Sequence, residues 1–161
     1  MCFQGAQKEG VCDDADAKRL WDNTYEKANE RIRAAMRGLI ESSRTYGLRF
    51  GKASRTPILG QPGRYIQREF GEAGPPTKRY DGGTITIDTD GINRNLDIND
   101  ARLVLGHEIG HFYIPGEHEA AEDQIIADYE NPLREALGFP RRGRYRDPYP
   151  RLPAPGGVRF P

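Results

Sequence analysis

The chain of 161 residues has little histidine or cysteine, no excess of charge and no long apolar run. Its 24 basic residues balance its 24 acidic ones, so it lacks the net positive charge typical of nucleic-acid and anionic-membrane binding. No apolar run approaches the ~20 residues that a membrane-spanning helix needs. The segment 1–14 lacks the basic and then apolar regions of a Sec signal peptide. We therefore expect no nucleic-acid or membrane partner, and any export by a non-Sec route.

The two cysteines, Cys2 and Cys12, lie far along the chain from the histidines, which argues against a Cys/His zinc finger. We expect them to be free thiols in a flexible N-terminus, residues 1–12. The length fits one domain, which we assign to residues 13–149. Residues 150–161 are rich in proline and glycine and are expected to form an extended or disordered tail. The chain could also be the end of a larger polypeptide.

The N-terminal third predicts one long amphipathic helix, from about Asp13 to Ser43. Apolar residues recur there at the helical spacing: Leu20, Trp21, Thr24, Ala28, Ile32, Ala35, Met36, Leu39 and Ile40. Short strands are expected within 48–53, 56–61 and 64–70, where glycine and proline interrupt apolar runs. The clearest strand is Thr84–Asp90, in which β-branched and apolar residues alternate. This pattern predicts an α+β fold in which a long helix backs a small twisted sheet.

Two further helices are expected after that strand. The first follows an N-cap at Asp97 or Asn99 and stops at Pro115-Gly116. Its apolar face consists of Leu103, Val104, Ile109 and Phe112. The second runs from about Glu117 to Leu137, with a kink near Asn131 because a proline follows.

The first of these helices carries the pattern HExxH, formed by His107, Glu108 and His111. Residues four apart lie on one face of a helix, so the two imidazoles can bind one metal ion. Two histidines at this spacing, with glutamate in the second position, are typical of zinc peptidases of the zincin type. The pattern predicts that His107 and His111 bind Zn²⁺ and that Glu108 is the catalytic base. Gly110, inside the motif, suggests a close packing contact.

A third zinc ligand is expected, and His118 is the remaining histidine of the chain. The metzincin pattern HExxHxxGxxH does not fit, because Ile114 occupies the glycine position and Glu117 the histidine position. A metzincin also needs a methionine after the motif, and the only methionines are Met1 and Met36. We therefore expect His118 to be a loop residue.

An acidic third ligand on the following helix is the other solution. The candidates are Glu117, Glu119, Glu122 and Asp123. Glu122 shares its helical stripe with the apolar residues Ile125, Ile126 and Tyr129. A carboxylate on a buried stripe is costly without a cation or metal. We expect Glu122 to be the ligand, with Glu119, Asp123 and His118 as alternatives; a partner role toward Arg134 or Arg141 is the competing interpretation.

The motif and the segment after it resemble the NleD-like zinc metallopeptidases. This family includes type III effectors of pathogenic bacteria and HExxH toxin domains at the C-termini of Rhs-type polymorphic toxins. The resemblance covers about Thr84–Tyr145. Its more specific part follows the acidic helix and consists of Glu130, Asn131, Arg134, Glu135, Gly138, Pro140, Arg142 and Tyr145.

The resemblance implies a zincin-like zinc endopeptidase of effector or toxin type that cleaves a target protein. It implies that His107 and His111 are ligands, Glu108 is the base and Glu122 corresponds to the acidic ligand. An immunity protein or a secretion chaperone is a further expected partner, and the setting is a target cell or, otherwise, the bacterial cytoplasm. Thr84–Asp90 is the expected edge strand that binds substrate.

Some alternatives stay open from the sequence. Tyr145 or one of Arg141, Arg142 and Arg144 could stabilise the oxyanion. A regulatory peptidase of the ImmA/IrrE type carries a similar HExxH motif. A catalytically decayed zincin-fold interaction module is the third interpretation.

Overall fold

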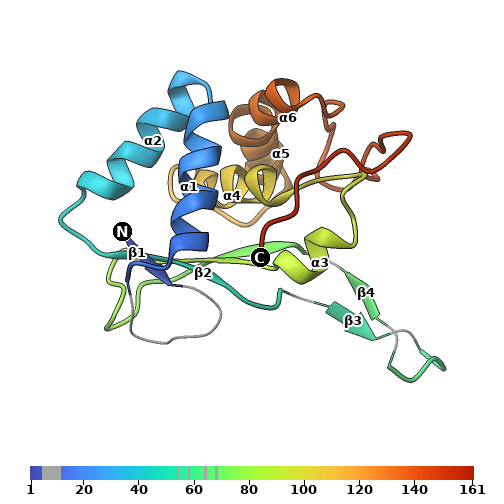
Figure 1. Cartoon of the computed structure of the whole chain (residues 1–161), viewed down its shortest axis with the longest axis horizontal. Coiled ribbons are helices and arrows are strands. Elements are labelled where there is room, and N and C mark those ends of the chain that lie inside the picture. The colour runs from blue at the N-terminus through green and yellow to red at the C-terminus, as the bar shows by residue number, and fades with distance from the viewer. Residues whose placement is uncertain (5–11, 54, 58, 64, 68) are drawn as a thin grey trace.

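A four-stranded sheet, covered on one face by helices, forms the body of this α+β protein (Figure 1). The computed structural model describes residues 1–4, 12–53, 55–57, 59–63, 65–67 and 69–161. Its elements in chain order are β1 (Cys2–Gln4), α1 (Ala15–Lys27), α2 (Glu30–Glu41), β2 (Tyr46–Phe50), β3 (Arg55–Pro57), β4 (Tyr65–Gln67), β5 (Gly71–Gly74), β6 (Gly83–Ile87), α3 (Thr89–Asn93), α4 (Ala101–Gly110), α5 (Glu119–Ile125), the π-helix η1 (Ile126–Glu130) and α6 (Asn131–Leu137). Among the described residues, no helix is long and apolar enough to cross a membrane.

The sheet has the strand order β1-β2-β6-β5. The first three strands are parallel, and β5 runs antiparallel to β6. The predicted edge strand Thr84–Asp90 is therefore wrong in its place, because β6 is paired on both sides and β5 is the edge. The predicted strands within 56–61 and 64–70 overlap the separate antiparallel pair β3–β4, although residues 58, 64 and 68 lie outside the described part.

The N-terminal helix is two helices, so the prediction of one helix from Asp13 to Ser43 is wrong. Helix α1 ends at Lys27, and Ala28 has the extended backbone angles φ −71° and ψ 152°. The side chain of Asn29 then caps α2 by accepting a hydrogen bond from the Ile32 N–H at 3.0 Å. The apolar spacing continues through the break because both helices bury their stripes in the same core.

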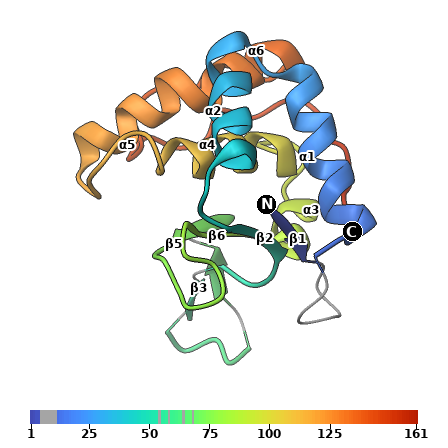
Figure 2. The ribbon, with the colours of Figure 1, turned by 90° about the vertical axis from the view of Figure 1, so that its left-hand side faces the viewer.

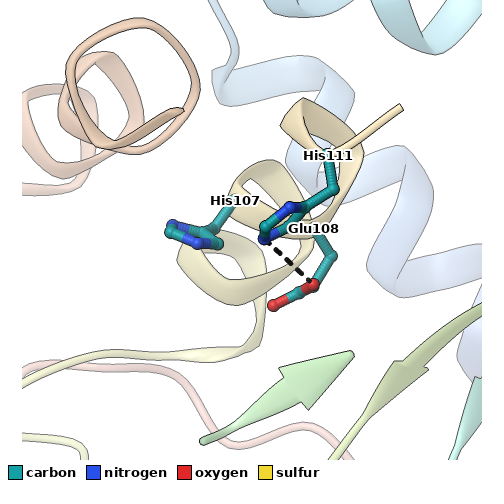
Figure 3. A group of neighbouring side chains, drawn as sticks. All are labelled: His107, Glu108 and His111. Atoms are coloured by element: carbon teal, nitrogen blue, oxygen red, sulfur yellow. Dashed lines mark ion pairs between the residues drawn. The ribbon is translucent and has the colours of Figure 1, made fainter. Parts of the chain in front are cut away.

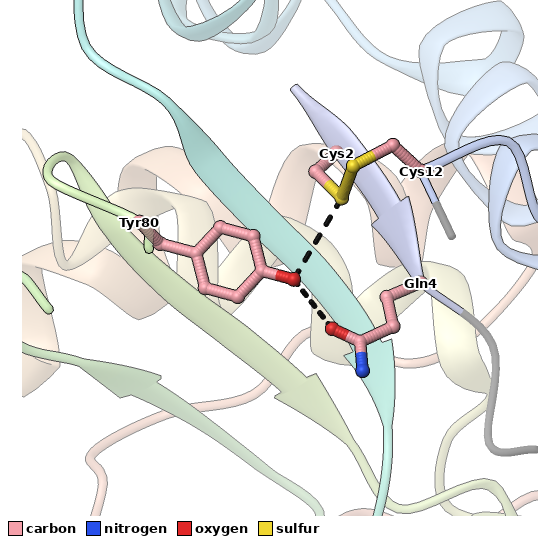
Figure 4. Close-up of a disulfide and its surroundings, with 4 residues drawn as sticks. All are labelled: Cys2, Gln4, Cys12 and Tyr80. Carbon is pink, nitrogen blue, oxygen red and sulfur yellow. Dashed lines mark hydrogen bonds between the residues drawn. A yellow bond between two sulfur atoms is a disulfide. The ribbon is translucent and has the colours of Figure 1, made fainter. Parts of the chain in front are cut away.

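The N-terminus is tied to the sheet, contrary to the expected flexible segment and free thiols. Cys2–Gln4 form β1, and a disulfide joins Cys2 to Cys12 (Figure 4). The Tyr80 hydroxyl donates a hydrogen bond to the Gln4 carboxamide oxygen at 2.5 Å and lies 3.7 Å from the Cys2 sulfur. Residues 5–11 lie outside the described part of the chain. The pairing of β1 with β2, which spacing alone does not reveal, places Cys2 in the buried core.

Helix α4 lies between the sheet and the α5–α6 segment, and all ten of its residues are buried. Figure 2 shows α1, α2, α4, α5 and α6 on the same side of the sheet. Apolar side chains of the sheet and the helices form one core that includes Leu20, Ile32, Leu48, Ile85, Leu105 and Ile109. The burial of a whole helix fixes its side chains against neighbours on every side, which suits a helix that carries a site.

The predicted second helix is present as the run α5–η1–α6. The kink expected near Asn131 corresponds to the π-helical turn that precedes Asn131, and the helix resumes with Pro132 in its first turn. Gly138 ends the run in the left-handed conformation, with φ 78°. The tail 150–161 forms no helix or strand, but it packs on the body. Its Phe160 is 3% exposed and accepts a hydrogen bond at its backbone carbonyl from the Asn93 side chain.

Candidate metal centre

Helix α4 presents the motif from a well-defined start. Asp100, one residue after the predicted cap Asn99, is the N-cap, and its side chain accepts a hydrogen bond from the Arg102 N–H at 2.9 Å. A Cβ at Gly110 would lie 2.8 Å from Ile125 Cγ2, so this glycine allows the close contact with α5 that the motif suggested. A Cβ at Gly106 would lie 2.7 Å from the Tyr129 carbonyl oxygen. These two glycines bring α4 and the α5–η1 segment close together.

The three motif side chains gather at one point beside the sheet (Figure 3). His107, Glu108 and His111 each offer a ligand atom, and these atoms lie within 4.8 Å of one another. The Glu108 carboxylate approaches the His111 Nε2 to 3.9 Å. The structure thus brings together all three residues that the pattern selected.

Glu122 reaches the same point from α5. Its two carboxylate oxygens lie 3.0 Å from the His107 Nε2 and 3.3 Å from the His111 Nε2. Both distances are shorter than the 3.9 Å between Glu108 and His111. Compared with Glu108, Glu122 is therefore the better placed as a ligand, which leaves Glu108 beside the ligand set.

The donor set and its spacing fit zinc. Bonds of about 2.0–2.2 Å in a tetrahedral zinc site separate the ligand atoms by roughly 3.3–3.5 Å. One Glu122 oxygen lies 3.0 Å from the His107 Nε2 and the other lies 3.3 Å from the His111 Nε2, which is close to that range. Two imidazole nitrogens and one carboxylate are a common donor set of catalytic zinc. His107, His111 and Glu122 would hold the ion.

Three of the other candidates for the third ligand, His118, Glu119 and Asp123, have partners of their own. His118 caps α5, and its Nδ1 accepts a hydrogen bond from the Ala121 N–H at 3.2 Å. Glu119 forms an exposed ion pair with Arg146, and Asp123 accepts a hydrogen bond from the Tyr145 N–H at 2.8 Å. None of these three contacts involves His107 or His111.

Glu130 is a site residue that our prediction did not assign a role. Its carboxylate is 2.9 Å from the Nδ1 of His107, on the opposite side of the ring from Glu122. It also accepts hydrogen bonds from Arg134 Nε at 2.6 Å and from Arg142 Nη1 at 3.0 Å. Arg134 therefore pairs with Glu130 rather than with Glu122. The sequence signal was the Glu–Arg pair at i and i+4.

His107 lies between two carboxylates, which act strongly on the charge of its ring. Burial lowers the pKa of His107, but hydrogen bonds to Glu122 and Glu130 outweigh it and raise this pKa to about 10. Burial raises the pKa of Glu122, and the hydrogen bond from His107 more than reverses that, so the net pKa falls. The two carboxylates thus favour a positive charge at this point of the site.

Glu108 has a different environment. Burial raises the pKa of its carboxyl to about 7, although the neighbouring His107 charge acts in the opposite direction. A carboxyl with this pKa exchanges its proton readily near neutral pH. Glu108 therefore suits proton transfer, whereas Glu122 suits a permanently charged ligand.

A cavity of about 740 Å³ opens over the site. Its walls include the motif residues, the strand segment 69–73, Tyr145 and Tyr149. Arg142 lines it as well, but it is ion-paired with Glu130, and neither Arg141 nor Arg144 is among the described lining residues. A cavity of this size accommodates several residues of a peptide.

Comparisons of the chain with protein-family models, with curated proteins and with solved structures found no match. The geometry of the site is therefore what points to a function.

Proposed function

We propose that the protein is a zinc-dependent endopeptidase with a zincin-like fold. The observation that carries this proposal is the convergence of the Glu122 carboxylate on the Nε2 atoms of His107 and His111, at 3.0 and 3.3 Å. When bound, the ion would act as a Lewis acid that polarises a carbonyl group and lowers the pKa of water. The reaction proposed is hydrolysis of a peptide bond in a target protein.

Glu108 is the general base in this proposal. Its carboxylate takes a proton from the attacking water and gives it to the leaving amine. A pKa of about 7, raised by burial, supports both steps because the group can hold and release the proton near neutral pH. The adjacent His107 keeps it next to the ligand set without making it a ligand.

Strand β5 is the proposed substrate-binding strand, in place of β6. It is the last strand in the sheet order, and its residues Gly71, Glu72 and Ala73 line the cavity. An extended peptide can add to such an edge through main-chain hydrogen bonds. Gly71 supports this role, since a Cβ there would lie 3.1 Å from Glu108 Cγ, so the strand passes directly beside the base.

Tyr145 is the proposed stabiliser of the oxyanion. It lines the cavity, and its ring centroid is 6.4 Å from that of His107. Burial raises the pKa of its hydroxyl, and the Glu122 charge adds to this effect, so Tyr145 keeps the proton that it would donate. Arg142, the one other candidate that lines the cavity, has its guanidinium engaged with Glu130.

An effector or toxin that acts outside its producing cell is the setting we propose, in line with the resemblance to NleD-like peptidases. The Cys2–Cys12 disulfide supports export, because disulfides persist in oxidising compartments and are rare in the cytoplasm. A protein substrate is the main partner, with an immunity protein or secretion chaperone as a second one.

The decisive test of activity is a comparison of newly formed N-termini in a target-cell extract. Wild-type, zinc-loaded protein should generate cleavage products that the Glu108→Gln variant does not. Zinc content is measured on both proteins, because Glu108→Gln should still bind the ion. The peptidase proposal fails if both proteins give the same N-termini while the wild type carries zinc.

A further inference from the structure

Glu130 stands at the end of η1, behind the His107 ring as seen from Glu122. Its side chain is nearly inaccessible, with the residue 3% exposed. The His107 Nδ1 is 2.9 Å from one of its carboxylate oxygens, while the His107 Nε2 is 3.0 Å from Glu122. The imidazole is therefore held at both nitrogens by carboxylates from two different turns of the α5–η1 segment.

This arrangement has a chemical consequence for metal binding. A neutral imidazole carries one proton, and the nitrogen without it is the one that can bind a metal. With an ion between Nε2 and Glu122, the carboxylate at Nδ1 would favour the tautomer with the proton there, and the Nε2 lone pair would be available to the ion. Carboxylate partners of this kind orient metal-binding histidines and strengthen them as ligands.

Glu130 is in turn fixed by two buried guanidinium groups. Arg134, which is fully buried, donates from Nε at 2.6 Å, and Arg142 donates from Nη1 at 3.0 Å. Asn131 holds the Arg142 backbone at both ends, since its Oδ1 accepts from the Arg142 N–H and its Nδ2 donates to the Arg142 carbonyl. The carboxylate thus has little freedom to turn away from His107.

The same network extends to the cavity. Arg142 Nη2 donates a hydrogen bond to the Tyr145 carbonyl at 3.2 Å, and the Tyr145 N–H donates to Asp123 at 2.8 Å. These contacts fix the backbone of Tyr145, whose ring lies near that of His107. Glu130 is accordingly connected both to His107 and, through Arg142, to the segment that lines the cavity.

We propose that Glu130 is a positioning residue, which orients His107 for metal binding and anchors, through Arg142, the segment that carries Tyr145. This inference rests on the proposed zinc site and adds a role for the segment after α5. It explains why Glu130, Asn131, Arg142 and Tyr145 occur together: they form one connected set of hydrogen bonds.

Zinc affinity tests the proposal without any assay of activity. Competition with a chromophoric chelator should show zinc binding by Glu130→Gln to be about 10–100-fold weaker than by wild type. Glu119→Gln is the matched control, because Glu119 also lines the cavity but pairs with the exposed Arg146, and it should bind zinc like wild type. Equal zinc affinity of Glu130→Gln and wild type would overturn the role of Glu130 but not the proposed zinc site.

A second measurement leaves Glu130 and the proposed zinc ligands unchanged, so it does not depend on the folding of Glu130→Gln. Long-range ¹H–¹⁵N spectra of the zinc-loaded protein report which imidazole nitrogen carries a proton. The chain has three histidines, and His118→Gln reduces the spectrum to the two of the site. We expect His107 to be protonated at Nδ1 and bound to zinc at Nε2. A metal bond at Nδ1 would overturn the inference, and no zinc binding by wild type would overturn both it and the proposed function.

Discussion

Reduction of the Cys2–Cys12 disulfide should lower the free energy of unfolding by an amount that depends on the length of the loop that the bond closes. The bond joins residues that are ten apart in the sequence. Closing a loop of about this length removes chain entropy from the unfolded state worth about 2.7 kcal/mol at 25 °C. For a domain of this size, that loss corresponds to a fall in Tm of about 5–10 °C.

Urea unfolding of the metal-free protein, followed by circular dichroism, measures this difference. The double variant Cys2→Ser/Cys12→Ser is compared with wild type, each with and without a phosphine reductant that does not bind zinc. Reduced wild type and the double variant should agree, and the reductant should not affect the variant. Oxidised wild type as unstable as the double variant would refute the reasoning, since the bond would then constrain nothing.

Three further changes probe the site. Glu122→Ala should lose zinc and Glu119→Ala should keep it, as metal analysis after dialysis will show; the reverse pattern would reject Glu122 as the ligand. Gly71→Ala places a Cβ 3.1 Å from Glu108 Cγ, so it should lower kcat with zinc content unchanged and cost about 1–3 kcal/mol of stability; unaltered turnover would count against β5 beside the base. The hydrogen bond and charge of His107, with the charges of two arginines, outweigh burial and lower the pKa of Glu130 to about 2. The stabilising effect of the Glu130 carboxylate is complete above the ordinary pKa of 4.5 and is lost as pH falls toward 2. Urea titrations of the metal-free proteins should therefore show that wild type loses more free energy of unfolding over that range than Glu130→Gln does. Parallel plots of this free energy against pH would contradict the prediction.

Local patterns predicted the elements that depend on local chemistry. The motif helix, the acidic helix after it and the glycine that closes the α5–η1–α6 run all follow from spacing, caps and helix terminators. Periodicity also selected Glu122, and the structure places it between the two imidazoles because the stripe it shares with Ile125 faces α4. Its role as a zinc ligand stays a prediction.

Features set by contacts between distant segments could not be predicted in the same way. The order of strands depends on which segments pair, so nothing within Thr84–Asp90 reveals that β6 is internal and β5 is the edge. The disulfide depends on the contact of β1 with the Cys12–Asp13 segment, where the Phe3 N–H donates a hydrogen bond to the Cys12 carbonyl. The break at Ala28 could not be predicted because two helices that pack on one core keep a single apolar spacing.

Glu130 illustrates a third limit. Its carboxylate contacts His107, 23 residues away, and its charge is offset by Arg134 and Arg142. A buried glutamate next to an arginine at i+4 has the same sequence pattern as an ordinary helix ion pair. Only the position of the His107 ring distinguishes the two.

The location of zinc in crystals of the wild-type protein tests the central claim most directly. Anomalous diffraction at the zinc edge should give one strong peak per chain, about 2.0–2.2 Å from the Nε2 of His107, the Nε2 of His111 and a Glu122 carboxylate oxygen. A peak coordinated by other side chains, or no peak in crystals grown with zinc, would contradict the account.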